Sequence, residues 1–225
     1  MIIESLNTWG GRLRLPLQEH VSNQAPKVKG FLFQEMNPSL YRKLIRILPD
    51  HHGHFAIAHR REGLAMFVSR DTETSPVADL VVHDGQFVDQ RRILQYVQFE
   101  REGRLYTIIN YHGMLTAAKA DTDESIGQAH RVRAFLESVT GSKILCGDFN
   151  VMPDTETMRI IKGNDMVDLV TENNVKSTRN RHFKGEEQLA DYILVSRGIV
   201  DKVRFEVLPD EVSDHLALVV DVDVG

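Results

Sequence analysis

The sequence predicts an α/β fold of the α+β kind, in which two β-sheets pack together and helices lie outside them. Three observations lead to this fold class. Strand-like stretches recur throughout the chain, amphipathic helical segments lie between them, and 42% of the 225 residues are hydrophobic. No repeat, low-complexity tract or linker interrupts this pattern. We therefore expect a single domain over residues 1–225.

Ten stretches have the composition of strands: 2–6, 31–34, 55–58, 64–69, 93–99, 104–110, 143–147, 191–196, 203–208 and 216–222. The N-terminal "MIIESLNTWGG" lacks the basic region, apolar stretch and cleavage site of a signal peptide, and is interpreted as the first strand. Residues 93–99 and 104–110 are alternating runs joined by a short connection, which predicts a β-hairpin. Residues 51–55, "HHGHF", are interpreted as a solvated loop rather than a metal cluster.

Three segments have helical character. The first spans residues 37–49 between two prolines, and its apolar face consists of Leu40, Leu44, Ile47 and Leu48. The second spans residues 124–141 and ends at a glycine, and its apolar stripe consists of Ile126, Ala129, Val132, Leu136 and Val139. A shorter third helix is expected around residues 155–162. Helices with one apolar face pack against a sheet, so we place them on the outside of the fold.

The composition limits the function and the compartment. The net charge is -5, so no global field attracts nucleic acid. The one cysteine, Cys146, rules out an intramolecular disulfide framework and is interpreted as a buried, inert thiol. We expect the protein in a reducing cytoplasm. No window has the apolar run of a membrane-spanning helix, so we expect no membrane anchor, and no obligate protein partner is evident.

Polar side chains stand at six strand termini. The clearest case is "KILCGDFNVMPD", residues 143–154, where a buried strand is followed by Asp148 and Asn150, whose spacing points both side chains to one side. The full set is Asn7, Gln34, Glu35, His112, Asp148, Asn150, Asp191, Asp214 and His215. Any one of them alone is typical of a turn, a cap or a satisfied buried polar group. Six termini together are better explained by one shared site.

These residue types support a narrow range of chemistry. Carboxylates such as Glu35 bind hard divalent cations, and Mg²⁺ in proteins keeps several waters and binds substrate phosphate. The sequence lacks a histidine pair or cysteine cluster with the spacing of a structural zinc site, a glycine-rich phosphate loop with its lysine, and a G-x-S-x-G motif. Acid, amide and imidazole around a hard metal suit the in-line attack of water on a phosphate ester.

The ordered motifs "LNTWGG", "FQEM", "NYHG", "GDFNVMPD", "ADYILVS" and "SDHLALVVDV" resemble the endonuclease/exonuclease/phosphatase superfamily. Its members include DNase I, exonuclease III-like repair enzymes, inositol polyphosphate 5-phosphatases and neutral sphingomyelinases. The motifs run from residue 6 to residue 222. The resemblance implies a DNase I-like, four-layered α/β sandwich of two packed, mostly antiparallel sheets with outer helices. It also implies a site at one edge, where the two sheets converge.

For the metal, the resemblance implies that Glu35 is the principal ligand of Mg²⁺, with Mn²⁺ as an alternative, and that Asn7 lies beside it. Asp214, the acid next to the histidine of the "SDH" motif, would bind a second metal ion. Whether one metal ion or two take part stays open at this point.

For the reaction, the resemblance implies that Asp148 orients or deprotonates the attacking water and that Asn150 holds this water or the phosphoryl oxygens. His215 would bind the scissile phosphate, and Asp191 would fix the tautomer and orientation of its imidazole. His112 would donate a hydrogen bond to a non-bridging oxygen.

Two features depart from the family pattern or stay undecided. Repair nucleases of this family commonly have W-N-x-D-G, whereas here Trp9 stands where their second acid would be, and we interpret Trp9 as a core residue. The segment "STRNRHFKGEEQ", residues 177–188, lies just before the strand that begins at Asp191. Its basic residues are Arg179, Arg181, His182 and Lys184. This segment either grips phosphate or is a solvated loop balanced by its two glutamates.

The sequence leaves three functions open. The first is a Mg²⁺-dependent phosphoesterase acting on a phosphodiester, in DNA, RNA or a small molecule. The second is a phosphomonoesterase acting on a phosphorylated metabolite or inositol head group. The third is a non-catalytic binding or scaffold protein on the same fold, which the intact set of polar residues argues against. The acidic net charge slightly disfavours duplex DNA as the substrate.

Overall fold

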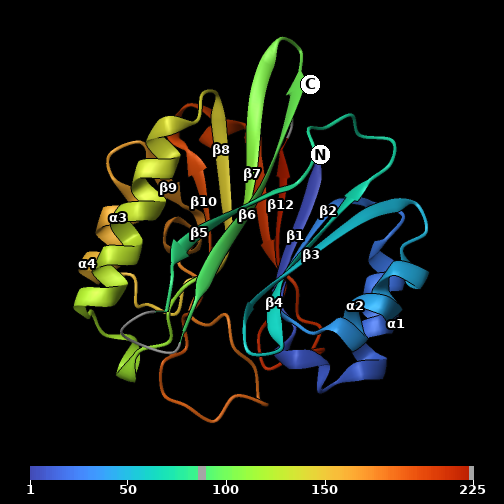
Figure 1. Ribbon diagram of the computed structural model, residues 1–225, viewed down its shortest axis with the longest axis horizontal. Helices are drawn as coiled ribbons and strands as arrows, with labels where there is room; N and C mark the ends of the chain where they lie inside the picture. Colours follow the sequence, from blue (N-terminus) through green and yellow to red (C-terminus); the bar gives the residue numbers. More distant parts are fainter. Residues whose placement is uncertain (86–89, 223–225) are drawn as a thin grey trace.

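The computed structural model describes residues 1–85 and 90–222, and in this part of the chain two six-stranded sheets face each other (Figure 1). The first sheet has the order β11 (Val203–Val207), β12 (Leu218–Val222), β1 (Ile2–Asn7), β2 (Val28–Met36), β4 (Glu62–Ser69) and β3 (His51–His59). The second has the order β5 (Ala78–His83), β6 (Arg92–Arg101), β7 (Arg104–His112), β8 (Ser142–Asp148), β10 (Asp191–Ser196) and β9 (Met166–Asp168). The pairs β1–β2 and β7–β8 are parallel, and the other pairs are antiparallel. The prediction of mostly antiparallel sheets is confirmed.

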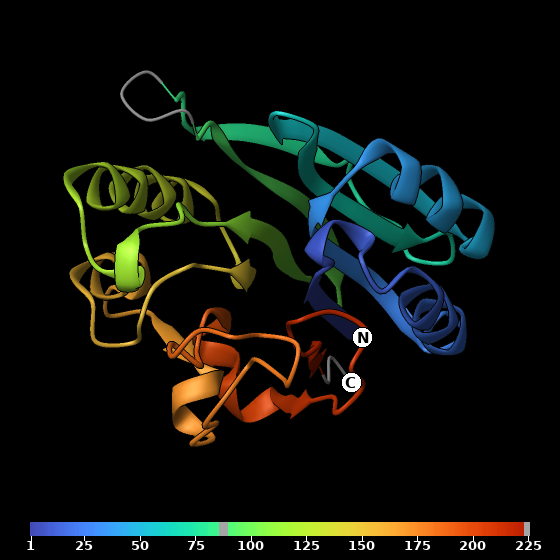
Figure 2. The same ribbon diagram turned by 90° about the horizontal axis from the view of Figure 1, so that it is seen from below.

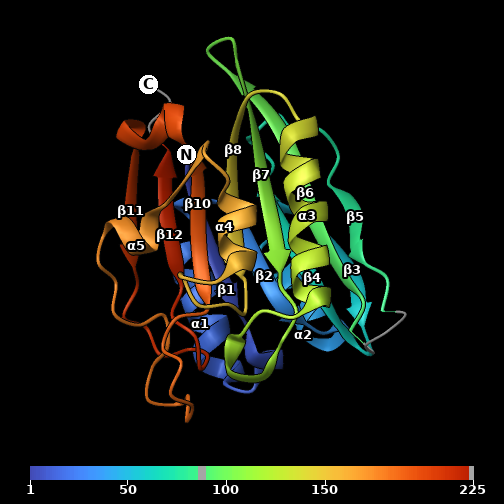
Figure 3. The same cartoon turned by 90° about the vertical axis from the view of Figure 1, so that its left-hand side faces the viewer.

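Helices cover the outer face of each sheet (Figures 1 and 3). On the first sheet lie α1 (Arg14–Gln24) and α2 (Pro38–Ile47), and on the second lie α3 (Asp123–Ser138) and α4 (Glu156–Lys162). Short helical segments complete the chain: α5 (Leu169–Glu172) and the 3₁₀ turns η1 (Trp9–Gly11), η2 (Ala117–Lys119) and η3 (Arg197–Lys202). The predicted four-layered sandwich with outer helices is confirmed.

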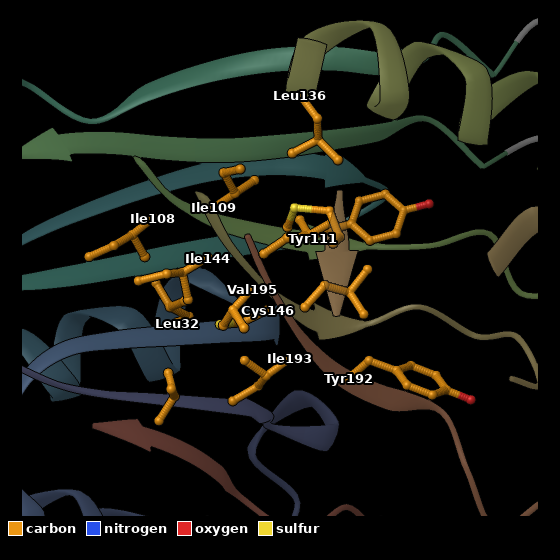
Figure 4. Packing of buried hydrophobic residues seen from close by; sticks show 14 of the residues in the cluster. Leu32, Ile108, Ile109, Tyr111, Leu136, Ile144, Cys146, Tyr192, Ile193 and Val195 are labelled. Atoms are coloured by element: carbon orange, nitrogen blue, oxygen red, sulfur yellow. The ribbon is translucent and has the colours of Figure 1, made fainter. Parts of the chain in front are cut away.

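Two apolar cores follow from the alternation of side chains along buried strands. In β2, Phe31 and Phe33 point toward α1 and α2, while Leu32 between them points into the space between the sheets. Ile144 of β8 and Ile193 of β10 fill the same inter-sheet core (Figure 4). Because both faces of these strands are covered, they appear in the sequence as continuous apolar runs.

The three predicted helices form where the sequence has helix-start signals. Asn37 caps α2 by accepting hydrogen bonds from the backbone N–H groups of Ser39 and Leu40. Thr122 and Ser125 form a reciprocal capping box at the start of α3. The predicted apolar faces of both helices contribute to the cores, through Leu40 and Leu44 or Val132 and Leu136.

The interpretation of "HHGHF" as a solvated loop is wrong. Residues 51–55 form the first half of β3, paired with Ser69 to Ala65 of β4. His51 is buried, and its Nε2 donates to the carbonyl of Val28, so it has a structural role. An edge strand leaves one side and part of one face in water, and can therefore have a polar sequence.

Several elements lacked a usable sequence signal. Helix α1 buries only Leu17, His20 and Val21, so its apolar stripe is too narrow to recognise. His20 is buried because its Nε2 bonds a carboxylate oxygen of Glu4 at 2.9 Å. Strand β5 lies at a sheet edge, and β9 and α5 are very short.

Candidate active site

The strand topology brings the predicted polar residues to one edge of the sandwich. Because β1 and β2 are parallel, Asn7 and Glu35 lie near the same end of the first sheet. In the second sheet, His112 at the end of β7 is the register partner of Asp148 at the end of β8, and Asp191 at the start of β10 pairs with Asp148. This edge is the lower one in Figure 1 and faces the viewer in Figure 2.

Asn7 joins the two sheets at this edge. Its buried Nδ2 donates to Glu35 Oε1 at 3.1 Å and to Asp148 Oδ2 at 2.8 Å. Its Oδ1 accepts from the backbone N–H of Trp9 at 3.0 Å, which fixes the orientation of the amide. One amide group therefore holds two carboxylates from different sheets close together.

Glu35 is aimed at the site by an irregularity in β2. The pairing of β2 with β4 shifts register between Phe33 and Met36, and Glu35 has a φ of 51°, which is uncommon for a residue other than glycine. Burial raises the pKa of the Glu35 carboxyl, against the opposing effect of the hydrogen bond from Asn7. The metal-free environment thus disfavours the ionised form of Glu35.

The donor atoms fit a hard divalent cation. Ligand atoms of Glu35, His112 and Asp148 lie within 4.8 Å of one another, and a second group of Asp148, Asp191 and His215 meets the same limit. Carboxylate oxygens predominate around Glu35 and Asp148, which is the donor chemistry of Mg²⁺ or Mn²⁺ sites. A cation there would neutralise the two carboxylates that Asn7 holds together.

Asp148 and Asn150 are positioned by a tight crossing of strands. A Cβ at Gly147 would lie 1.8 Å from the carbonyl oxygen of Tyr111 on β7, so only glycine fits there. Asn150 has a φ of 54°, and its backbone N–H donates to Asp148 Oδ1 at 2.9 Å. The "GDFN" motif thus fixes the Asp148 carboxylate and places Asn150 next to it in the site.

His215 is oriented by a carboxylate. Its Nδ1 donates to Asp191 at 2.8 and 2.9 Å, and the Thr178 hydroxyl donates to Asp191 Oδ2 at 2.7 Å. Its Nε2 lies 3.7 Å from Asp148 Oδ2. Burial, the largest effect, lowers the pKa of His215, but the charge and hydrogen bond of Asp191 outweigh it, so the net pKa is raised. The pKa of Asp191 is lowered by His215 in spite of burial, so this carboxyl is ionised.

His112 is a neutral imidazole at the bottom of the site. Its Nε2 lies 3.8 Å from Asp148 Oδ2. Burial, followed by the nearby charge of Arg92, lowers the pKa of His112 to about 3. It can therefore donate a hydrogen bond without carrying a charge.

A pocket of about 520 Å³ opens over these groups. Its floor contains Glu35, His112, Asp148, Asn150, Asp214 and His215, and its walls include Trp9, Arg12, Arg92, Arg179 and Phe183. The volume is in the range of pockets for small ligands.

The family model described as "Endonuclease/Exonuclease/phosphatase family" matches residues 5–215, which include every predicted site residue. The chain belongs to this family. No curated protein sequence matches it.

Solved structures of the endonuclease/exonuclease/phosphatase family have the same fold. A mannosyl-6-phosphatase of Bacteroides thetaiotaomicron is 18% identical, with a TM-score of 0.78 and 99% of each chain covered. TDP2 of D. rerio, humanised by 14 mutations, is 14% identical, with a TM-score of 0.80 over 98% of this chain and 97% of that one. The human Nocturnin catalytic domain with a bound sulfate anion is 16% identical, with a TM-score of 0.72 over 98% and 92%.

Asp214 contacts Arg179 and His215 rather than Asn7. Its Oδ2 accepts from Arg179 Nη1 at 3.2 Å, and its Oδ1 lies 3.8 Å from His215 Nε2. Its role as a ligand of a second metal ion stays a prediction.

Sequence analysis missed or left undecided several pocket residues, among them Arg179, Arg92 and Trp9. Arg179 belongs to the basic segment 177–188, for which the sequence left a phosphate-binding role and a solvated loop equally open. Arg92 begins β6, and its place beside the site follows from sheet pairing, which the sequence does not display. The interpretation of Trp9 as a core residue is wrong: it is half-buried, lines the pocket and lies under the guanidinium of Arg12, 4.8 Å from its ring centre.

Arg181, in the same segment 177–188, differs from Arg179. Arg181 is exposed, pairs through its Nε with Glu211 at 2.6 Å and is not among the residues that line the pocket in the described part of the chain.

Within residues 1–85 and 90–222, no helix is long and apolar enough to cross a membrane.

Proposed function

We propose that this chain is a Mg²⁺-dependent phosphoesterase, with Mn²⁺ as an alternative cation, that hydrolyses a phosphodiester by in-line attack of an activated water. The observation that carries the proposal is the bond of one amide, Asn7, to Glu35 and Asp148, next to the Asp191–His215 pair. A metal-binding carboxylate, a water-orienting carboxylate and a phosphate-binding imidazole then share one pocket.

Each residue has a defined task in this reaction. Glu35, with Asn7 beside it, would hold the cation, and the cation, when bound, would polarise a phosphoryl oxygen. Asp148, oriented by Asn7 and by the N–H of Asn150, accepts a hydrogen bond from the attacking water. His215, held by Asp191, donates to the phosphoryl group, and neutral His112 donates to another of its oxygens.

A phosphomonoesterase is the second candidate, favoured by the size of the pocket and by one similar fold. The pocket of about 520 Å³ would hold a phosphorylated small molecule. A fold neighbour that covers the whole chain is named as a mannosyl-6-phosphatase. The substrate is a phosphate ester in either case, with DNA and RNA among the diesters to be tested.

We also propose that the protein works in the cytoplasm, since its one cysteine is a fully buried free thiol that suits a reducing compartment.

The test is hydrolysis of a phosphoester panel with Mg²⁺, with Mn²⁺ and with EDTA. The panel contains plasmid and single-stranded DNA, RNA, a chromogenic diester, a chromogenic monoester, inositol phosphates, hexose 6-phosphates and sphingomyelin. We expect metal-dependent turnover that Asp148→Asn removes, and the preferred substrate decides between diester and monoester. A purified wild-type protein that binds the metal and cleaves nothing faster than Asp148→Asn would contradict the proposal.

A further inference from the structure

Arg179 is a buried cation in contact with the reactive groups of the site. It is only 8% exposed and lines the pocket. Its Nη1 donates to Asp214 Oδ2 at 3.2 Å and to His215 Nε2. Its Nε is buried and has no hydrogen-bond partner among the described residues. A buried guanidinium with an unused N–H is costly, which indicates that this group serves a ligand.

The backbone holds Arg179 in place. Arg179 and His215 form an isolated antiparallel β-bridge, and the N–H of Leu216 donates to the carbonyl of Thr178 at 2.8 Å. The guanidinium also stacks on Phe183, with its Cζ 4.3 Å from the ring centre. The segment is thus fixed to the same backbone that carries His215, so the guanidinium keeps its position relative to the imidazole.

A purely structural ion pair between Arg179 and Asp214 does not explain these contacts. Such a pair would need neither exposure to the pocket nor a bond to His215 Nε2. Asp191 bonds the other imidazole nitrogen, Nδ1, so a phosphoryl oxygen that accepts a hydrogen bond from His215 must approach Nε2, which lies 3.7 Å from Asp148 Oδ2. Arg179 therefore occupies the position that a phosphoryl oxygen takes when His215 donates to it.

We propose that Arg179 is a further catalytic residue: when a proton from solvent binds His215 Nε2, the Arg179 guanidinium leaves this nitrogen for a non-bridging oxygen of the phosphoryl group and stabilises the charge that develops there. The inference rests on the proposed phosphoesterase function. Arginine suits this task because its planar fork can bond Asp214 and a phosphoryl oxygen together, and it stays charged when buried. Thr178, which donates to Asp191, is a positioning residue for the same imidazole.

The experiment compares Arg179→Gln, Arg179→Lys and Arg179→Gly with Arg181→Gln, a control on the same segment whose side chain is exposed and outside the pocket. Loss of one charge-stabilising donor typically lowers kcat by about 10²–10³-fold. We expect that loss in Arg179→Gln with a smaller change in KM, a partial loss in Arg179→Lys, and wild-type kinetics in Arg181→Gln. Guanidinium chloride at low millimolar concentration should restore part of the activity of Arg179→Gly and leave wild type unchanged.

A second measurement does not depend on turnover. Inorganic phosphate is titrated by calorimetry into wild type, Arg179→Gln and Arg181→Gln in the presence of Mg²⁺. We expect phosphate to bind at least about tenfold more weakly to Arg179→Gln than to the other two proteins. Because removal of Arg179 leaves the Asp214 charge unpaired, the double variant Arg179→Gln/Asp214→Asn serves as the folding control, and it should keep the weak phosphate binding.

The outcomes separate this inference from the proposed function. Equal phosphate affinity in wild type and folded Arg179→Gln would overturn the inference, whatever the activity. A wild-type kcat in Arg179→Gln, with Asp148→Asn inactive, would do the same and leave the phosphoesterase intact. If wild type cleaves no phosphoester, the proposed function fails, and the phosphate titration still decides whether Arg179 binds the anion.

Discussion

Replacing Glu35 with glutamine should stabilise the metal-free protein and remove its response to metal. Facing carboxylate oxygens of Glu35 and Asp148 lie within 4.8 Å of each other. Two unit charges at that distance repel by about 3.5 kcal/mol at an effective dielectric constant of about 20. Glu35 is partly exposed, so solvent screening reduces the expected gain to about 1–3 kcal/mol. The glutamine oxygen can still accept the hydrogen bond that Asn7 donates to Glu35.

The assay is thermal unfolding of wild type and Glu35→Gln in EDTA and in Mg²⁺. In EDTA at pH 7–8, Glu35→Gln should melt about 2–12 °C above wild type, at roughly 2–4 °C per kcal/mol for a chain of this size. In Mg²⁺ at about 100 times its Kd, wild type should gain about 2.7 kcal/mol and Glu35→Gln almost nothing. Glu100→Gln, an exposed change at the far end of β6, should match wild type in both buffers.

The stability difference between wild type and Glu35→Gln should depend on pH. Because the folded-state pKa of Glu35 is raised, its protonated form contributes stability that is present below the unfolded-state pKa of about 4.3 and is lost as pH rises through the folded-state value. The advantage of Glu35→Gln in EDTA should therefore vanish near pH 4 and appear above the raised pKa. A variant that is less stable than wild type in EDTA at pH 8 would refute the repulsion between Glu35 and Asp148. A variant that keeps the full Mg²⁺ response would refute the assignment of Glu35 as the metal ligand.

Three further changes have expected outcomes. Asp191→Asn removes the charge that raises the pKa of His215, so the limb of the pH–kcat profile that reports His215 should move to lower pH. The value of kcat should also fall by about 10²–10⁴-fold. An unchanged profile would contradict the pairing of Asp191 with His215. His112→Gln should lower kcat by about 10–100-fold. No limb of the pH–kcat profile between pH 5 and 9 should move, since the pKa of His112 is about 3. A shifted limb would show that His112 titrates between pH 5 and 9. Gly147→Ala should lower the free energy of unfolding, measured by urea denaturation, by about 3 kcal/mol or more, because its Cβ would lie 1.8 Å from a carbonyl oxygen of β7. A neutral effect would mean that this strand crossing is looser than described.

The fold and most of the site could be predicted because they depend on local patterns. The buried strand before Asp148 and the capped helices α2 and α3 each have a short, characteristic sequence signature. Edge strands and narrow amphipathic helices have none, which is why half of β3, all of β5 and α1 were not predicted. Arg92 reaches the site through sheet pairing and Arg179 through a β-bridge, and neither contact leaves a periodic pattern in the sequence.

Trp9 was misplaced for a different reason. Its size favours the core, and the sequence does not show that the chain leaves β1 in a 3₁₀ turn with a φ of 49° at this residue. That turn places the Trp9 backbone N–H on Asn7 and its ring at the pocket wall. The same residue therefore orients the amide that joins Glu35 to Asp148 and forms part of the pocket wall.

The alignment of the two sheets decides the geometry of the site, because Asn7 and Glu35 come from one sheet and Asp148 from the other. Directly behind the site, the fully buried Gln34 donates to Asn110 Oδ1 at 2.7 Å across the inter-sheet core. Asn110 Nδ2 in turn lies 3.2 Å from the carbonyl oxygen of Phe33 and from that of Ala65, both in the opposite sheet. Apolar packing alone would tolerate a small slide between the sheets, whereas these directional bonds do not. The amide contacts thus help to fix the distance between the Glu35 and Asp148 carboxylates.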